Sequence, residues 1–106
     1  MKVWKPVLNF EDYYEVSSWG EIRNKKTGRI LKQHLNGEYL KVKLSKEGKQ
    51  YTFYSHRVVA YAFHPKPENC RVVNHIDGIG THNSACNLEW VTDSENAKHS
   101  IERRKK

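Results

Sequence analysis

The feature that most constrains this chain is a strict alternation of apolar and lysine side chains between two glycine turns. In the segment YLKVKL at residues 39–44, the aliphatic side chains share one face and the lysines share the other. An Asn-Gly pair at 36–37, a strong hairpin signal, precedes the segment, and a Glu-Gly pair at 47–48 follows it. This pattern predicts a half-buried strand of an antiparallel sheet.

Shorter segments of similar character surround this strand. They lie at residues 14–17, 21–24, 29–32 and 50–54, with turns between them. Together they predict an antiparallel β-sheet meander over residues 1–54, with one apolar and one basic face. At Ser55 the spacing of apolar residues changes to that of a helix. We therefore predict a helix over 55–63, which Ser55 caps and the His-Pro pair at 64–65 ends.

The rest of the chain predicts a strand, a long polar loop, a second strand and a second helix. The strands are expected at 71–76 and 87–91, with the loop at 79–86 between them. Thr92 and Glu95 have the spacing of a capping box, which predicts that a helix begins there. The order of elements indicates an α+β fold.

Basic side chains outnumber acidic ones by 19 to 12, which gives a net charge of +7 with neutral histidines. Residues 1–54 carry 11 basic and 6 acidic side chains, whereas residues 55–106 carry 8 and 6. An excess of positive charge attracts polyanions, and nucleic acid is the usual polyanion inside a cell. The side chains expected to contact phosphates are Arg23, Lys25, Lys26, Arg29, Lys32, Lys41, Lys43 and Arg57. The alternative is that these side chains only solvate the outer face of the sheet.

The cysteines and the hydropathy pattern indicate the cellular compartment in which we expect the protein. Cys70 and Cys86 form neither a disulfide framework nor a CxxC pair, so we expect two free thiols. No apolar stretch approaches the roughly 18 residues of a membrane span, and the N-terminus lacks the apolar core of a signal peptide. We expect a soluble, cytoplasmic protein with no membrane partner and no obvious protein partner.

Short motifs along the chain resemble the HNH endonucleases, and most closely the phage-type HNH homing endonucleases. In the second half they are VNHIDG at 73–78, NLEWVT at 87–92 and the Glu-Asn pair at 95–96. Upstream, WKPV at 4–7, YEVS at 14–17, GEIRN at 20–24 and TGRILK at 27–32 resemble the sheet motif that accompanies this nuclease. The resemblance implies a DNA-contacting antiparallel sheet at 1–54. It also implies a helix and a ββα-metal nuclease motif with a basic tail at 55–106.

The resemblance also implies a reaction and its residues. A metal-dependent DNA endonuclease hydrolyses phosphodiester bonds to 5′-phosphate and 3′-hydroxyl ends, which requires a base for the attacking water and a cation for the developing charge. Carried over to this chain, His75 is the general base, and Asn74 and Asn96 hold one divalent cation, Mg²⁺ or Mn²⁺. Asn87 ties down the loop by hydrogen bonds to backbone and so sets the orientation of His75.

Other histidines are alternatives for these roles. His99 lies three residues after Asn96 and could replace it as a metal ligand. His56 is expected to form a hydrogen bond within the core or to touch a phosphate. His82, in the polar loop, is a weaker candidate for the site.

The chain departs from the family pattern in two ways. Asn74 occupies a position that is often acidic, so the cation is held by uncharged amides unless Asp77 contributes charge. We therefore expect weak metal binding until DNA is in the site. The sequence also ends at Lys106, soon after the nuclease motif. From this we expect limited sequence specificity and an affinity that comes largely from phosphate contacts.

The partner implied by the resemblance is double-stranded DNA, which a monomer would nick and a homodimer could cut on both strands. A phage-encoded protein in the bacterial cytoplasm is the implied setting. Two other functions stay open at this point. One is a catalytically silent DNA-binding or regulatory module on the same fold, although a binding module has no need of a base beside a cation site. The other is an RNA-directed nuclease, although the sequence carries no RNA-binding signature.

Overall fold

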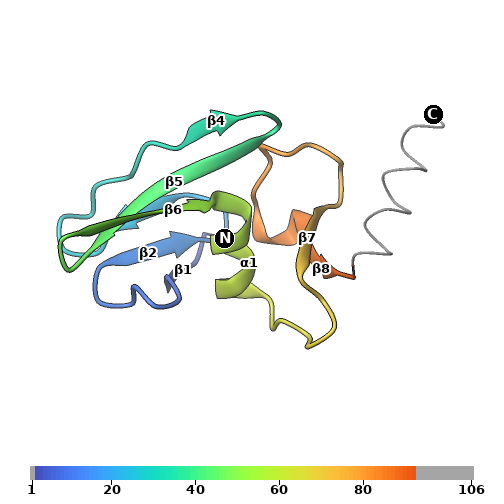
Figure 1. The fold of residues 1–106 in the computed structure, drawn as a ribbon, viewed down its shortest axis with the longest axis horizontal. Helices are drawn as coiled ribbons and strands as arrows, with labels where there is room; N and C mark the ends of the chain where they lie inside the picture. The colour runs from blue at the N-terminus through green and yellow to red at the C-terminus, as the bar shows by residue number, and fades with distance from the viewer. Residues whose placement is uncertain (1, 93–106) are drawn as a thin grey trace.

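The computed structural model describes residues 2–92, which form an α+β fold. The elements are β1 (Trp4–Pro6), β2 (Tyr14–Ser17), β3 (Ile22–Asn24), β4 (His34–Asn36), β5 (Tyr39–Lys46), β6 (Lys49–Tyr54), α1 (Ser55–Phe63), β7 (Val72–His75), the 3₁₀ turn η1 (Ala85–Asn87) and β8 (Leu88–Val91). Figure 1 shows α1 between the N-terminal strands and the β7–β8 pair. The fold class expected from the sequence is confirmed. The helix predicted after Thr92 and the basic tail lie outside the described residues.

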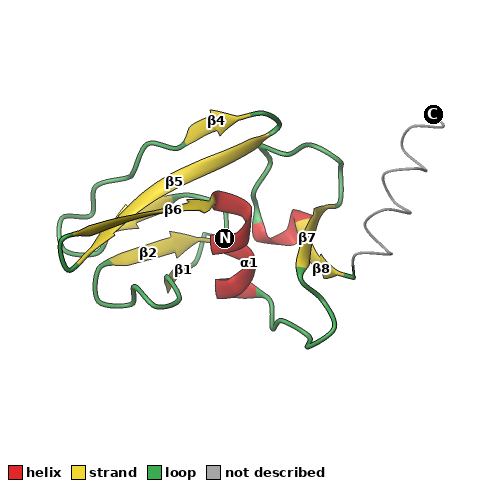
Figure 2. Cartoon of the chain, viewed as in Figure 1, coloured by secondary structure: helices red, strands yellow, loops and turns green. Residues whose placement is uncertain are grey.

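The first half contains two antiparallel sheets instead of the single meander that the alternation predicted. β1, β2 and β3 form one sheet, and β4, β5 and β6 form the other; Figure 2 shows their strands in yellow. The predicted strand at 29–32 is wrong, because it is reduced to a bridge between Ile30 and Arg23. Asn24 closes the turn before it by accepting backbone N–H groups from residues 26 and 27. The chain then leaves the first sheet and enters the second.

The hairpin of β5 and β6 confirms the alternation that predicted it. The two strands pair in register from Lys41 opposite Tyr54 to Lys46 opposite Lys49. The aliphatic side chains of β5 lie on the inner face, where positions 42 and 44 are buried and position 40 is half-buried. Lys43 is exposed on the outer face. Burial of one face therefore sets the register of this strand.

Helix α1 begins and ends where the sequence predicted, but its cap is different. Tyr54 is the capping residue, and Ser55 is the first residue of the helix. The hydroxyl of Ser55 is buried and has no hydrogen-bond partner among the described residues, so the prediction that it caps the helix is wrong. The helix ends at Phe63, and His64 is extended because the ring of Pro65 disfavours a helical residue before it.

One hydrophobic core joins the two halves of the described chain. It consists of Val7, Phe10, Tyr14, Val16, Ile22, Val42, Leu44, Val58, Val59, Ala60, Val73, Ala85 and Leu88. Helix α1 supplies the middle of this cluster and contacts strands of all three sheets. A division into domains at residue 54 stays a prediction, and the shared core places the β7–β8 pair firmly against the N-terminal sheets. None of the described helices is long and apolar enough to cross a membrane.

Candidate active site

Strand β7 carries Asn74 and His75 at its C-terminal end. β7 pairs with β8 in antiparallel register, with Asn74 opposite Glu89 and His75 opposite Leu88. Since neighbouring residues of a strand point to opposite faces, the side chains of Asn74 and Glu89 extend from one face and that of His75 from the other. Asn74 and His75 are 8% and 5% exposed, which is unusual for polar side chains and indicates that both are held in place.

The imidazole of His75 is bounded on three sides. Its Nε2 lies 2.8 Å from Oδ1 of Asn83, at hydrogen-bond distance. The ring of Tyr39 stacks on it at 5.7 Å between centroids and 28° between planes. The ring of His56 meets it edge-on at 5.0 Å. These contacts come from three separate segments of the chain, and they leave the ring a single orientation.

His56 is buried and its ring lies beside that of His75, and its contact with a phosphate stays a prediction. Burial, followed by the charges of His75 and Arg57, lowers the pKa of His56 to about 4. Its Nδ1 is buried and has no hydrogen-bond partner among the described residues. The core hydrogen bond that the sequence suggested for it is therefore absent at this nitrogen. A neutral imidazole packs beside His75 without adding a like charge.

Asn87 connects the two ends of the loop between β7 and β8, here called the 76–87 loop. Its Nδ2 donates to Oδ1 of Asp77 at 3.0 Å and to the carbonyl of His82 at 2.8 Å. Its Oδ1 accepts the N–H of Asp77 at 3.1 Å, and its carbonyl accepts the N–H of Ile76 at 2.8 Å. The hydrogen bonds to backbone are those that the sequence predicted for Asn87. Its part in a reaction stays a prediction.

Asp77 and His82 form a hydrogen-bonded pair within this loop that the sequence analysis did not predict. His82 Nδ1 lies 2.6 Å from Asp77 Oδ2, and Asp77 Oδ1 accepts the N–H of Ile79 at 2.8 Å. The hydrogen bond from His82, followed by that from Ile79, lowers the pKa of Asp77 to about 2. Both carboxylate oxygens of Asp77 therefore have donors within the loop. This occupation argues against the idea that Asp77 contributes charge to a cation.

The donor set for a cation is only partly within the described residues. Asn74 is described, whereas Asn96 and the alternative ligand His99 lie outside the described range. Among residues 2–92, no group of three or more His, Cys, Asp or Glu side chains could hold a metal ion. The amide oxygen of Asn74 and the carboxylate of Glu89, its partner across the ladder, are hard oxygen donors of the kind that Mg²⁺ prefers.

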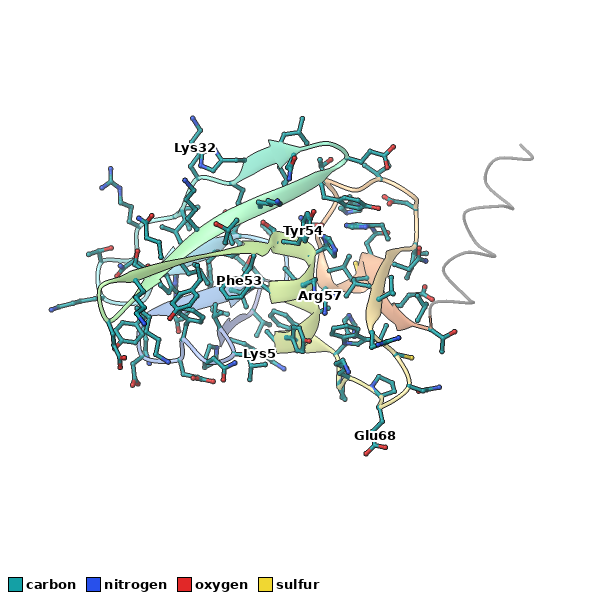
Figure 3. All side chains as sticks on the ribbon, in the orientation of Figure 1. Lys5, Lys32, Phe53, Tyr54, Arg57 and Glu68 are labelled. Atoms are coloured by element: carbon teal, nitrogen blue, oxygen red, sulfur yellow. The ribbon has the colours of Figure 1, made fainter. Side chains whose placement is uncertain are left out.

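The basic side chains proposed for DNA contact divide into two groups. Two arginines have partners within the protein. The guanidinium of Arg23 pairs with Glu15 at 2.9 Å and stacks on Trp4 at 3.9 Å. Arg57 donates to the carbonyl of Arg71 at 2.9 Å, and Figure 3 shows it between α1 and β7.

The other group is largely exposed, and of its members Lys25 also donates to the carbonyl of Glu11 at 3.4 Å. Its members are Lys25, Lys26, Arg29, Lys32 and Lys43, and Figure 3 shows Lys32 extending away from the sheets. Lys41 is half-buried, and its ammonium lies over the ring of Tyr54 at 4.9 Å. The exposed members are concentrated in residues 25–32, between the two N-terminal sheets, which we call the basic segment.

Comparisons with known proteins agree with this geometry. Residues 3–45 match the model of the NUMOD4 motif, and residues 53–98 match that of an HNH endonuclease. The chain is 38% identical over 101 residues to the DNA endonuclease I-HmuI of Bacillus phage SP01. It is 43% identical over 98 residues to an uncharacterized HNH endonuclease of Acanthamoeba polyphaga mimivirus. These alignments cover 94% and 92% of this chain.

A solved structure, described as DNA binding and cleavage by the HNH homing endonuclease I-HmuI, matches with a TM-score of 0.86 at 37% identity. The match covers 95% of this chain and 59% of the solved one. The chain thus spans only part of the proteins that it resembles, namely 58% of the phage endonuclease and 29% of the mimivirus protein.

Proposed function

Because this chain belongs to the HNH endonuclease family, we propose that it is a metal-dependent DNA endonuclease that leaves 5′-phosphate and 3′-hydroxyl ends. The observation that carries the proposal is the position of His75, which is buried at the end of β7 with one ring nitrogen bonded to Asn83. A ring held in this way is oriented for proton transfer at its other nitrogen. DNA is the proposed substrate because the phage relative is a DNA endonuclease.

His75 is the proposed general base. In its neutral form the imidazole of His75 can take a proton from water as the water attacks phosphorus. The packing of Tyr39 and His56 around the ring removes the entropic cost of orienting it at the moment of reaction. Asn87 acts indirectly, because it holds the 76–87 loop that carries Asn83.

Asn74 and Asn96 are the proposed ligands of one divalent cation, Mg²⁺ or Mn²⁺. When bound, the cation supplies positive charge to the phosphate and to the departing 3′ oxygen. Asn74 brings an uncharged amide oxygen, and Asp77 is engaged within the loop. The carboxylate of Glu89 extends from the same face as Asn74 and is the described acidic group placed to strengthen such a site. We expect weak metal binding before DNA is present.

The basic segment is the proposed surface for the DNA backbone. Its exposed side chains gain from long-range attraction to phosphates, whereas Arg23 and Arg57 have partners that DNA would have to displace. Relative to the sequence expectation, we therefore assign DNA contact mainly to Lys25, Lys26, Arg29, Lys32 and Lys43. A monomer with this one site would nick duplex DNA, and a homodimer would cut both strands.

The proposal is tested with supercoiled plasmid in the presence of Mg²⁺ or Mn²⁺. We expect the protein to convert the plasmid to open circle or linear DNA and to stop when the metal is chelated. His75→Ala should be inactive, whereas His34→Ala, which changes an exposed histidine of β4, should cut normally. Plasmid binding without cleavage by the wild type would identify a silent DNA-binding module. Cleavage of an RNA substrate in preference to plasmid would identify an RNA-directed nuclease.

A further inference from the structure

The 76–87 loop is held against the N-terminal sheets at two places. Its Ala85 N–H donates to the carbonyl of Ser18 at 2.7 Å. Earlier in the loop, Gly80 lies so close to the carbonyl of Glu38 and the ring of Tyr39 that no side chain would fit there. Figure 1 shows the loop reaching from β7 to the end of the β4–β5 hairpin. The loop that bears Asn83 is therefore shaped partly by residues outside the nuclease motif.

Gly20 also approaches this loop closely. A Cβ placed on Gly20 would lie 2.8 Å from the carbonyl oxygen of Asn83 and 3.0 Å from its Cβ. Gly20 has a φ of 91°, a conformation that other residues rarely adopt. The turn from Ser17 to Gly20, which connects β2 with β3, thus packs directly on the backbone of Asn83. Only glycine allows this contact.

Asn83 connects this turn with His75, the proposed general base. Its side chain is 5% exposed, and its Oδ1 lies 2.8 Å from Nε2 of His75. With Oδ1 of Asn83 facing the ring, this hydrogen bond needs a proton on Nε2, because an amide oxygen accepts hydrogen bonds and cannot donate them. In this orientation Nδ2 of Asn83 is buried and has no hydrogen-bond partner among the described residues. The other ring nitrogen, Nδ1, then keeps its lone pair. Nδ1 is therefore the atom free to take a proton from water.

We propose that Asn83 is a positioning residue that holds His75 as its Nε2–H tautomer, and that the turn from Ser17 to Gly20 keeps Asn83 in place. The N-terminal sheet is then part of the scaffold of the active site as well as a surface for DNA. This inference rests on the proposed role of His75 as general base. It assigns that role to one atom and extends the site into the NUMOD4 segment.

Four variants separate the parts of this proposal. Asn83→Leu removes the acceptor at similar size, whereas Asn83→Asp retains an acceptor for Nε2–H. In Gly20→Ala, the added methyl group clashes with the backbone of Asn83. Gly28→Ala is its matched control, because Gly28 also has a positive φ, of 74°, but has nothing near the added methyl group. Both alanine variants therefore carry similar backbone strain, and only one disturbs Asn83.

The first readout is the ring proton of His75, measured without metal or DNA. One-bond ¹H–¹⁵N spectra detect ring N–H groups that a hydrogen bond protects from exchange, and they distinguish Nε2–H from Nδ1–H. The signal is assigned by its absence in His75→Gln. We expect an Nε2–H signal in the wild type, Asn83→Asp and Gly28→Ala, and its loss in Asn83→Leu and Gly20→Ala. A proton on Nδ1 in the wild type would overturn the proposal, whatever the Asn83 and Gly20 variants show.

The second readout is the cleavage rate at saturating protein. We expect it to fall roughly 10- to 100-fold in Asn83→Leu and Gly20→Ala, with DNA affinity unchanged, and to recover in Asn83→Asp. Wild-type cleavage by Asn83→Leu would overturn the inference and leave the proposed function standing. The expected ring signals in a protein that cuts no DNA would overturn the proposed function and support the role of Asn83.

Discussion

The 76–87 loop and the basic segment at residues 25–32 differ in how they place their polar side chains. In the loop, the buried side chain of Asn87 forms hydrogen bonds with Asp77 and with the backbone of His82, and the buried side chain of Asn83 lies at hydrogen-bond distance from His75. In the basic segment, cationic side chains stay exposed above a turn that the side chain of Asn24 closes. The first arrangement fixes atoms in space, and the second leaves charge free to meet a partner.

This difference suggests a division of labour within the proposed nuclease. A buried hydrogen-bonded group loses its function when one partner is removed, because the other partners move or are left unsatisfied. Exposed cations act nearly independently, and each contributes a small share of the affinity. Changes in the loop should therefore alter the rate of cleavage, whereas changes in the basic segment should alter DNA affinity and its dependence on salt.

The largest effect is expected at Asn87. Asn87→Ala removes three side-chain hydrogen bonds, and at about 1 kcal/mol each the free energy of unfolding should fall by roughly 3 kcal/mol. The loop should shift, and the single-turnover cleavage rate should fall roughly 10²-fold. DNA affinity should stay within about twofold of the wild type, because no cation is removed.

Asn87→Asp sharpens this test. It keeps the oxygen that accepts the N–H of Asp77, but it replaces the donating amide with a second carboxylate facing the first. We expect its cleavage rate to be no higher than that of Asn87→Ala. If Asn87→Asp cut DNA at the wild-type rate, the hydrogen bonds that Asn87 donates could not be what orders the loop.

The next effect is the response of the site to acid, through His56. Its pKa is lowered to about 4 by burial and then by the charges of His75 and Arg57. Because this pKa lies below the unfolded value, the neutral ring stabilises the fold at high pH, and that stability is lost as pH falls from about 6.5 to about 4. At about 1.4 kcal/mol per pH unit, the loss amounts to roughly 3 kcal/mol.

Chemical denaturation of the wild type and His56→Gln at several pH values measures this loss. Glutamine does not titrate, so the two curves of unfolding free energy against pH should converge towards pH 4. The basic segment contributes nothing to such a difference, because lysine and arginine stay charged throughout this range. Parallel curves would show that His56 is not held neutral in the folded protein.

The basic segment should control affinity. Replacing Lys25, Lys26, Arg29 and Lys32 together by glutamine should weaken DNA binding at least about tenfold at low salt. The slope of log K against log salt should decrease by about 0.9 for each phosphate that is no longer neutralised. Once the protein saturates the DNA, the cleavage rate should match the wild type. A lower rate at saturation would mean that the basic segment also positions the scissile phosphate.

A change in the affinity for metal ions is expected when Asn74 is replaced by a charged residue. Asn74→Asp adds a carboxylate at the proposed cation site, and calorimetry should show Mn²⁺ bound to the free protein roughly tenfold more tightly. Glu89→Gln should act in the opposite direction if its carboxylate faces the same cation. Unchanged affinity in Asn74→Asp would argue that Asn74 is not a ligand.

The smallest effect separates two arginines. Arg23 is held by Glu15 and Trp4, so Arg23→Gln should leave the salt dependence of DNA binding unchanged. Arg29→Gln is the matched substitution at an exposed position and should lower the slope by about 0.9. Equal slopes for the two variants would show that the ion pair of Arg23 opens when DNA binds.

Much of the fold could be predicted because its signals are local. The alternation around Val42 and the change of spacing at Ser55 follow from burial of one face of a strand or helix. The division into two sheets could not be predicted in this way, since it depends on where the chain goes after residue 31. The capping role given to Ser55 failed for a similar reason, because Ser55 already belongs to the helix and is buried in the core.

The candidate site shows the same limit. Asn74, His75 and Asn87 could be singled out from motifs, because they lie at fixed spacing around one strand and one loop. Asn83 and Tyr39 could not, because their meaning depends on contacts with His75 across 8 and 36 residues of sequence. The pair of Asp77 and His82 had a weak signal, an acid and a histidine in one polar loop. Gly20 had none beyond its place in a turn.

The most direct measurement of the central claim is the chemistry of the ends that the protein leaves. Plasmid nicked by the wild type is purified and treated with DNA ligase, with His75→Ala and His34→Ala handled in parallel. We predict that the wild type and His34→Ala yield nicks that ligase seals, because water attack with loss of the 3′ oxygen leaves a 5′-phosphate beside a 3′-hydroxyl. His75→Ala should yield no nicks. Nicks that cannot be sealed, or equal nicking by His75→Ala, would contradict the claim that His75 drives hydrolysis of DNA.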